Sequence, residues 1–430
     1  MTLRRNASLP RGLPLLLGLL LVAPLVARPA AARWSAGLGP STDRAETPAA
    51  AGFDTFRARL EALEQGERRV VRVVHLGDSE VSDDLVVRTL RHRFAERYGD
   101  AGPGFVAAMR PWSWYYREAW RAGPPDGFRP VVYSRAKLPG GGYGPGGVAF
   151  EAKRAGALAE VALARPILGP CDVAFHFARQ PAGAALELLA DGVRFAAIRS
   201  ASVQSGPTAE RRRFVDCPRR LAVRVGEGPA TIYGWSVEGA GSGVVWSSLG
   251  VVAGRLPLLL RYEDAALRDG LRALRPDLVV LSFGINAAAW PRGPSSSYFG
   301  DVEVALGKVR DALPGAPCLV VGPYPLGRRR DGHEEAHPVA RWVSQRMGRA
   351  AVASGCGYLD RYEMVGGAPA VLRWRQREPP RLRDDLVHLT ANGSDWMGER
   401  IFRTLVAGLA LEPGRRFPAH LSLPADLGGG

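Results

Sequence analysis

The sequence predicts an α/β fold, with a parallel sheet covered by helices on both faces and a β-sandwich inserted into that domain. Two observations indicate this arrangement. Strand-like and helix-like segments alternate before residue 120 and again after residue 244. Between them, residues 121–243 contain short alternating apolar runs separated by Gly, Pro and Ser turns. Long loops are the alternative for 121–243, but so much irregular chain is unusual in a compact domain.

The first part of the α/β domain contains three predicted elements. Apolar residues recur at helical spacing from 53 to 65. The β-branched run 69–76 ends at a glycine, which is typical of a buried strand. Helical periodicity resumes from 81 to 98, so we expect Ser79 at a turn between a strand and a helix.

The insertion and the second part of the α/β domain are interpreted in the same way. Strands of the insertion are predicted at 172–177, 186–189, 221–225 and 231–237. Helices of the second part are predicted at 251–274, 302–313, 339–353 and 396–411. Strands of the second part are predicted at 278–283, 318–321 and 358–359.

The N-terminus is typical of a secretory signal. Arg4 and Arg5 precede an apolar run at 13–26, and three alanines at 30–32 provide a cleavage site. An uncleaved anchor helix is the alternative, but the run is short for a membrane span. We therefore expect an exported protein, periplasmic or extracellular, with no membrane span after cleavage.

The segments that flank the domains have biased compositions. Residues 33–50 are rich in Pro, Ala, Gly and Ser, as linkers are, and the last residues are typical of a flexible tail. The predicted boundaries are 1–32 for the signal peptide, 33–50 for the linker, 51–120 and 244–412 for the α/β domain, 121–243 for the inserted sandwich and 413–430 for the tail.

Composition limits the classes of partner. Hydrophobic residues make up 46% of the 430 residues, which excludes a disordered chain. The formal net charge is +15, and about +11 remains once the four arginines of the predicted signal are removed. A basic exported protein is attracted to anionic envelope polymers. The sequence contains no nucleic-acid-binding motif, so we expect no nucleic acid partner.

The four cysteines show no metal-ligand spacing, and we expect neither a metal nor a cofactor. In an oxidising compartment they allow two disulfides in three possible pairings. Their positions favour Cys171–Cys217 and Cys318–Cys356. Buried free thiols are the alternative.

Two short motifs supply a nucleophile and its base. Gly77-Asp78-Ser79 provides a hydroxyl, which attacks a carbonyl only when a neighbouring base takes its proton. The expected helix start at Ser79 adds partial positive charge that stabilises a developing anion. Asp385-Leu386-Val387-His388 provides His388 as that base, and Asp385 orients the imidazole. Asp384 is a competing orienting acid with a spacing one residue longer.

A third motif supplies donors for an oxyanion. Asn286 follows a predicted strand and a glycine, and its amide is suited to donate to an oxyanion. The backbone N–H groups of Ser79 and Gly250 are the expected partners, since glycine allows close approach of the backbone. The alternatives are a helix N-cap for Asn286 and an ordinary turn for Gly250.

The order of these motifs resembles the SGNH, or GDSL-type, esterase and lipase family. Residues 244–255 are similar to its second block, and residues 364–393 to the C-terminal part of its bacterial cell-envelope branch. The resemblance implies a three-layer α/β/α fold, a covalent acyl-enzyme and no metal. Two residues depart from the family pattern: Glu80 stands where this branch often has His, and Ala287 where the family often has an acid.

The cell-envelope branch includes peptidoglycan and polysaccharide O-acetylesterases, some with a β-sandwich where residues 121–243 lie. The resemblance therefore implies an exported serine esterase that removes O-acyl groups, specifically O-acetyl groups, from an envelope or extracellular polysaccharide. One alternative is a polysaccharide O-acetyltransferase that uses the same triad. The other is a carbohydrate-binding envelope protein that does not catalyse.

An aromatic cluster follows the first part of the α/β domain and is not explained by the motifs. Aromatic faces can stack on sugar rings, and they can equally pack a domain interface. The sequence leaves both interpretations open for Trp112, Trp114, Tyr115, Tyr116 and Trp120.

Overall fold

The computed structural model describes residues 53–295 and 297–408. The predicted signal peptide, the linker 33–50 and the tail 413–430 lie outside the described residues. Within the described ranges, no helix combines the length and the apolar character that crossing a bilayer requires.

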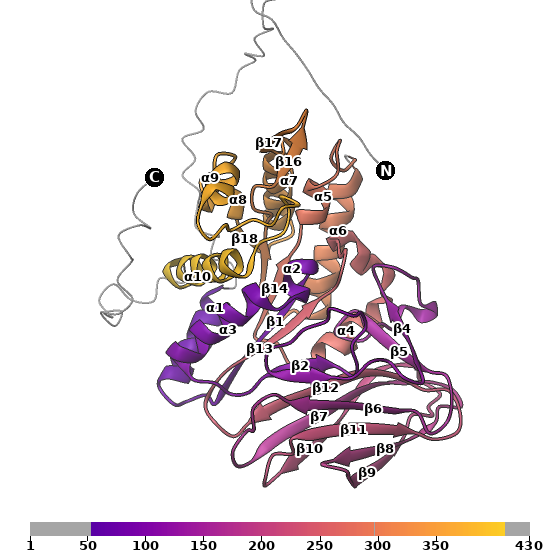
Figure 1. Ribbon diagram of the computed structural model, residues 1–430. Helices are drawn as coiled ribbons and strands as arrows, with labels where there is room; N and C mark the ends of the chain where they lie inside the picture. The colour runs from indigo at the N-terminus through magenta and orange to yellow at the C-terminus, as the bar shows by residue number, and fades with distance from the viewer. Residues whose placement is uncertain (1–52, 296, 409–430) are drawn as a thin grey trace, which may run out of the picture. The chain divides into compact units, whose positions relative to one another are not determined.

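A five-stranded parallel sheet forms the centre of the α/β region (Figure 1). Its strands, in spatial order, are β13 (Gly243–Gly250), β1 (Val70–Gly77), β14 (Leu278–Ser282), β15 (Cys318–Val321) and β18 (Gly357–Leu359). The side chains of β14 and β15 are buried throughout, as expected for a sheet covered on both faces. The parallel sheet predicted from the sequence is therefore confirmed.

Helices form the outer two layers, so the predicted three-layer α/β/α arrangement is confirmed (Figure 1). One group packs together on one side: α1 (Phe53–Glu64), α3 (Leu85–Tyr98) and α10 (Ala391–Gly408). The other group consists of α4 (Asp264–Arg272), α6 (Ser297–Ala312) and α7 (Val339–Ala353). Short helices lie in the connections: α2 (Ser79–Ser82), α5 (Ile285–Ala288), α8 (Arg361–Met364), α9 (Ala370–Gln376), η1 (Pro139–Gly141) and η2 (Leu256–Arg261).

Two antiparallel sheets stack into the predicted β-sandwich (Figure 1). One sheet contains β10 (Gly206–Phe214), β7 (Cys171–Arg179), β12 (Thr231–Gly239), β5 (Val148–Ala152) and β4 (Phe128–Val132), and β2 (Gly104–Ala107) also pairs with β12. The other contains β3 (Trp120–Ala122), β6 (Leu158–Leu163), β11 (Arg220–Val225), β8 (Ala185–Ala190) and β9 (Val193–Arg199). Strand β2 precedes the segment 121–243 yet pairs with its last strand.

Some elements differ from the sequence prediction. The helix predicted at 81–98 is broken into α2 and α3 because Asp84 takes a left-handed conformation, with φ 63°. The helix predicted at 251–274 is a turn followed by η2 and α4. The arginines at 328–330 form a hairpin that the sequence analysis did not anticipate, in which β16 (Gly327–Arg330) pairs with β17 (His333–Ala336).

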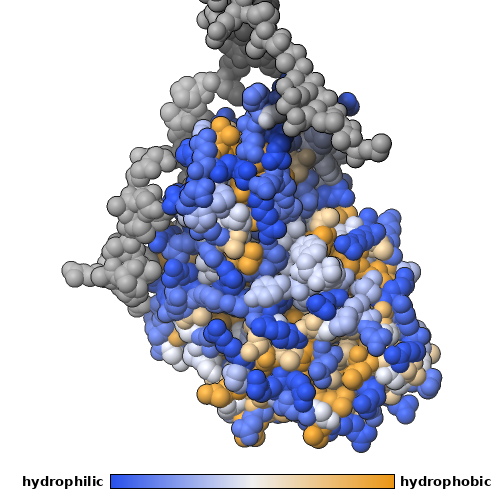
Figure 2. Space-filling view, in the orientation of Figure 1, coloured by the Kyte–Doolittle hydropathy of each residue, from blue (hydrophilic) through white to orange (hydrophobic). Residues whose placement is uncertain are grey.

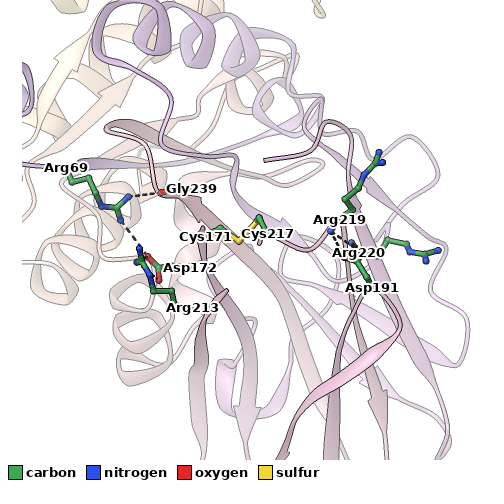
Figure 3. The surroundings of a disulfide bond; sticks show 9 residues. All are labelled: Arg69, Cys171, Asp172, Asp191, Arg213, Cys217, Arg219, Arg220 and Gly239. Atoms are coloured by element: carbon green, nitrogen blue, oxygen red, sulfur yellow. Dashed lines mark hydrogen bonds and ion pairs between the residues drawn. A yellow bond between two sulfur atoms is a disulfide. The ribbon is translucent and has the colours of Figure 1, made fainter. Parts of the chain in front are cut away.

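Each region contains one disulfide. Cys171 at the start of β7 is bonded to Cys217, and Cys318 at the start of β15 is bonded to Cys356, so the favoured pairing is confirmed. Figure 3 shows hydrogen bonds around the first disulfide, where Asp191 accepts from the backbone N–H groups of Arg219 and Arg220. Figure 2 shows hydrophilic residues over most of the visible face and apolar residues in small separate groups.

Candidate active site

The candidate residues follow the carboxyl ends of the parallel strands. Taken along the chain, the five strands lie in the order second, first, third, fourth, fifth. In such sheets ligands bind beside the first strand, where the connections diverge. Ser79 follows β1 and Asn286 follows β14, its neighbour, so both lie at this switch point.

Ser79 is the first residue of α2. The Asp78 side chain caps this helix by accepting a hydrogen bond from the Glu80 N–H at 3.2 Å. The Ser79 hydroxyl oxygen lies 3.3 Å from Nε2 of His388, although the two residues are 309 positions apart. Hydrogen bonds of this length are common at catalytic sites without substrate, where the contact shortens once substrate binds.

Asp385 holds the imidazole of His388 by two routes. Its Oδ2 lies 2.7 Å from Nδ1 of the ring, and its Oδ1 accepts from the His388 backbone N–H at 2.8 Å. Partial burial raises the pKa of the Asp385 carboxyl, but these hydrogen bonds and one from the Val387 N–H outweigh burial and lower it overall. The ionised carboxylate therefore keeps a proton on Nδ1 and leaves the Nε2 lone pair toward Ser79.

The competing acid Asp384 does not reach the imidazole. Its side chain is 92% exposed and pairs with Arg375 at 3.1 Å. The structure thus brings Asp385, and not Asp384, to His388.

The turn that leads to His388 has a strained backbone and is held by hydrogen bonds. Leu386 is buried in a left-handed conformation, with φ 60°. Its carbonyl accepts from the N–H of Gly327 at 2.8 Å, and a Cβ at Gly327 would lie only 2.8 Å from Cβ of Leu386. The hydroxyl of Tyr324 donates to the carbonyl of Val387 at 2.8 Å. Tyr324 and Gly327, in the segment after β15, therefore fix the backbone carbonyls of Leu386 and Val387.

Asn286 lies in α5 after Gly284, whose φ of 114° favours glycine. Its amide nitrogen donates to the carbonyl of Gly254 at 3.0 Å. This bond orients the amide. The second hydrogen of that nitrogen has no acceptor in the part of the chain that the structure describes.

Gly250 ends β13 and is required for packing. A Cβ at this position would lie 2.1 Å from the backbone nitrogen of Ser82 in α2. The contact to Asn286 comes instead from Gly254, after a turn in which Ala253 is left-handed with φ 54°. The structure therefore brings Asn286 to the 251–254 turn rather than directly to Gly250.

A buried ion pair includes Glu80, the residue after Ser79, and its basic partner was not predicted from the sequence. Nη1 of Arg361 donates to the Glu80 carboxylate at 2.6 Å, and Nε donates to the carbonyl of Gly322 at 2.6 Å. The guanidinium lies 5.0 Å from the ring centre of Tyr324. Arg361 thus connects Glu80, the residue after Ser79, with Tyr324, whose hydroxyl holds the turn before His388. A charged Glu80 beside a buried strand requires a partner, but the sequence does not identify which one.

Two carboxyls near Ser79 hold protons more strongly than usual. Burial, with the nearby Glu80 charge, raises the pKa of Asp78 to about 8. Burial also raises the pKa of Asp83 to about 7. When protonated, neither side chain opposes negative charge that develops beside Ser79.

His75, two residues before Gly77, is a core residue. Trp246 donates to its Nδ1 at 3.3 Å, which leaves its Nε2–H to donate to the Ser282 hydroxyl at 2.6 Å. Burial lowers its pKa to about 3, so the ring is neutral at ordinary pH. Its hydrogen bonds are satisfied within the sheet.

Part of the chain matches a known family model. Residues 200–396 match the GDSL-like lipase/acylhydrolase family, a range that includes Gly250, Asn286, Asp385 and His388 and begins after Ser79. A solved structure of a peptidoglycan O-acetylesterase shares the fold with a TM-score of 0.70 and 19% identity, over 83% of this chain and 97% of that chain.

Two further solved structures are less similar. They are an acetyl xylan esterase (TM-score 0.28, 18% identity, 37% of this chain and 79% of that one) and a family two carbohydrate esterase from Clostridium thermocellum in complex with cellohexaose (TM-score 0.28, 10% identity, 64% and 96%). No curated protein sequence matches the chain significantly.

Proposed function

We propose that this chain, an ester hydrolase of the SGNH/GDSL type, removes O-acetyl groups from an envelope or extracellular polysaccharide through an acyl-enzyme. The observation that carries the proposal is the line of contacts from Ser79 through His388 to Asp385, at 3.3 and 2.7 Å, beside the first strand of the sheet.

In the proposed mechanism Nε2 of His388 takes the proton of Ser79 as its oxygen attacks the ester carbonyl. The oxyanion is stabilised by the N–H of Ser79, by the Asn286 amide and by backbone donors around Gly250 and the 251–254 turn. His388 then gives its proton to the departing sugar hydroxyl. Water, deprotonated by His388, attacks the acetyl-serine and releases acetate.

The exposure of the site supports a polymeric substrate. The side chains of His388 and Asp385 are 43% and 48% exposed, so the reacting groups lie near the surface. A polymer reaches such a site without entering a tunnel. The similarity to a peptidoglycan O-acetylesterase over nearly its whole length supports the same substrate class.

The proposal includes export. The predicted signal peptide motivates it, and two disulfides are common in oxidising compartments.

The decisive test is acetate release from p-nitrophenyl acetate by the purified chain and by Ser79→Ala. We expect the substitution to lower kcat by about 10⁴-fold or more, because the nucleophile is lost. Ser82→Ala is a matched control in the same short helix. Its buried hydroxyl has no hydrogen-bond partner in the described residues, so we expect activity near that of the unchanged chain.

Substantial turnover by a folded Ser79→Ala variant would refute the mechanism. An acetylated glycan supplied with a second, unacetylated glycan separates hydrolysis from transfer. Free acetate supports the esterase, and acetyl groups on the second glycan would show a transferase.

A further inference from the structure

Packing holds three members of the aromatic cluster inward, whereas Trp114 is only partly packed, its ring centroid 5.8 Å from that of Trp112. Trp112 and Trp120 are buried. Tyr115 accepts a hydrogen bond from the Ala107 N–H at 3.2 Å, and its ring contacts the Arg117 guanidinium. In contrast, Trp114 and Tyr116, on either side of Tyr115, are 48% and 41% exposed. Two large aromatic side chains therefore face solvent from a loop whose other aromatic residues face inward.

A buried arginine ties this loop to the helix that carries the nucleophile. Nη1 of Arg117 donates to the carbonyl of Ser82 and to that of Tyr116, each at 2.7 Å. Nη2 donates to the carbonyl of Ser248 in β13 at 3.1 Å. Ser82 ends the short helix that Ser79 begins. One guanidinium nitrogen thus joins the backbone of Tyr116 to a residue within one helical turn of Ser79.

Charged and polar side chains follow the two exposed rings along the chain and link the loop to α3. The Glu118 N–H donates to Asp84 at 3.0 Å, and the Glu118 carboxylate pairs with Nε2 of His92 at 2.7 Å. Arg88 lies within electrostatic range of Tyr116 and pairs with Asp395 at 2.6 Å. Asp395 lies in α10, which begins three residues after His388. The loop is therefore tied both to α2, which Ser79 begins, and to α3, which in turn contacts α10 through Arg88.

We propose that Trp114 and Tyr116 form an aromatic platform that stacks on the sugar rings of a glycan chain whose ester lies at Ser79. The inference rests on the proposed function and states how the polymer is recognised. A fully apolar ligand does not match half-exposed rings on a loop that also carries the charged residues Arg117 and Glu118. A pyranose ring matches them, since it has an apolar C–H face and hydroxyls along its edge. The fixed loop loses little conformational entropy when a sugar binds.

The first test measures binding separately from catalysis. Chitopentaose and xylopentaose, both unacetylated, are titrated into the Ser79→Ala chain and into the same chain carrying Trp114→Ala and Tyr116→Ala. We expect the two substitutions to raise Kd at least ten-fold for at least one sugar, and the sugar affected identifies the class of backbone. Trp342→Ala is the matched control, because Trp342 is 41% exposed on α7 and meets the ring of Phe299 edge to face. We expect it to leave Kd unchanged.

The second test restores the rings. Trp114→Phe and Tyr116→Phe keep an aromatic face, so we expect them to recover most of the affinity that the alanine variants lose. In the catalytic chain, the alanine variants should lower kcat/KM for chemically O-acetylated chitopentaose relative to p-nitrophenyl acetate about ten-fold.

Equal binding by the platform variant and the control, or no binding of either sugar by the Ser79→Ala chain, would overturn the platform. Failure of the proposed function would give a different result. The unchanged chain would then release no acetate from p-nitrophenyl acetate, whatever its affinity for the sugars.

Discussion

The parallel sheet and the sandwich use their side chains in different ways. In β14 and β15 every side chain is buried, whereas in β6 buried and exposed residues alternate. A sheet covered on both faces has no room for reacting groups along its strands, so they gather at the strand ends. The sandwich exposes side chains along its outer faces, and the aromatic platform that we propose lies on the 110–118 loop that leads into it.

The ion pairs of the two regions also differ in how far their side chains are buried. Arg224 and Glu187 of the sandwich pair at 3.3 Å with both side chains well exposed, and such pairs contribute at most about 1 kcal/mol. Glu80 and Arg361 pair at 2.6 Å with both side chains nearly inaccessible. Removing one partner of a buried pair costs about 3–5 kcal/mol, because a charge is left without compensation. Removing a charge should therefore lower stability most at the Glu80–Arg361 pair next to Ser79.

The largest expected effect is on catalysis, in the α/β region, and comes from the acid that orients His388. Asp385→Asn should lower kcat on p-nitrophenyl acetate by about 10³–10⁴-fold, because an amide can stabilise the wrong tautomer of His388. The neighbouring Asp384→Asn removes a similar charge from a residue that is 92% exposed, and we expect less than about a two-fold change. If Asp384→Asn proved the more damaging change, our choice of orienting acid would be wrong.

The two disulfides allow a matched comparison of stability. Removing either by a double Cys→Ser substitution should lower the free energy of unfolding by roughly 2–4 kcal/mol, since the bridged positions lie 46 and 38 residues apart. Urea denaturation measures this loss. Only the loss of Cys318–Cys356 should also lower kcat, because β15 and β18 lead directly to Gly322 and Arg361. An equal loss of kcat without Cys171–Cys217 would show that the sandwich positions the site.

The site should also determine how stability depends on pH. Asp78, with a folded pKa of about 8, and Asp83, at about 7, are protonated in the folded chain well above the pKa of about 4 expected after unfolding. The unfolded chain then binds fewer protons, so stability falls as pH rises from about 4 to 8, by up to about 1.4 kcal/mol per pH unit for each group. Asp385, whose pKa is lowered, acts oppositely: its contribution is lost as pH falls through its folded pKa.

Asp78→Asn should flatten this decline, because asparagine caps a helix as well as aspartate and does not ionise. Denaturation at pH 5, 6, 7 and 8 provides the measurement. An unchanged slope would mean that Asp78 is ionised in the folded chain.

The smallest expected effect tests the contacts that hold the base turn. Tyr324→Phe removes the hydrogen bond to the Val387 carbonyl and should lower kcat about three- to ten-fold with little change in KM. Tyr298→Phe is the control, since its buried hydroxyl has no partner in the described part of the chain. Equal effects of the two substitutions would assign Tyr324 to general packing.

The sequence predicted best the elements whose apolar residues follow a regular pattern. Strand 318–321 and helix 339–353 have the predicted bounds, because a continuous apolar run and a strong helical period leave little ambiguity. Strand β13 was not assigned, since its serines interrupt the apolar pattern. The hairpin β16–β17 was missed because a run of arginines followed by two glutamates also suits a solvated loop.

In the candidate site, motif spacing was enough to select Ser79, Asp385 and His388, which the structure brings together. The residues that hold them were not predictable. Arg361 lies 281 positions from Glu80, and no local pattern marks that pair. No sequence pattern marked the Gly254 carbonyl as the acceptor for the Asn286 amide, and Gly250 as an oxyanion donor stays a prediction.

The position of β1 has a consequence for how the chain is made. This strand is synthesised early, but both of its partners, β13 and β14, follow the entire sandwich. A ribosome therefore releases β1 with two unpaired edges, and the pairing that closes the sheet has a high contact order. The strands of the sandwich are all synthesised before β13 is complete, so the sandwich can fold in this interval, which shortens the distance between β1 and its partners. The residue proposed to attack the ester is thus among the first to be synthesised and among the last to be positioned.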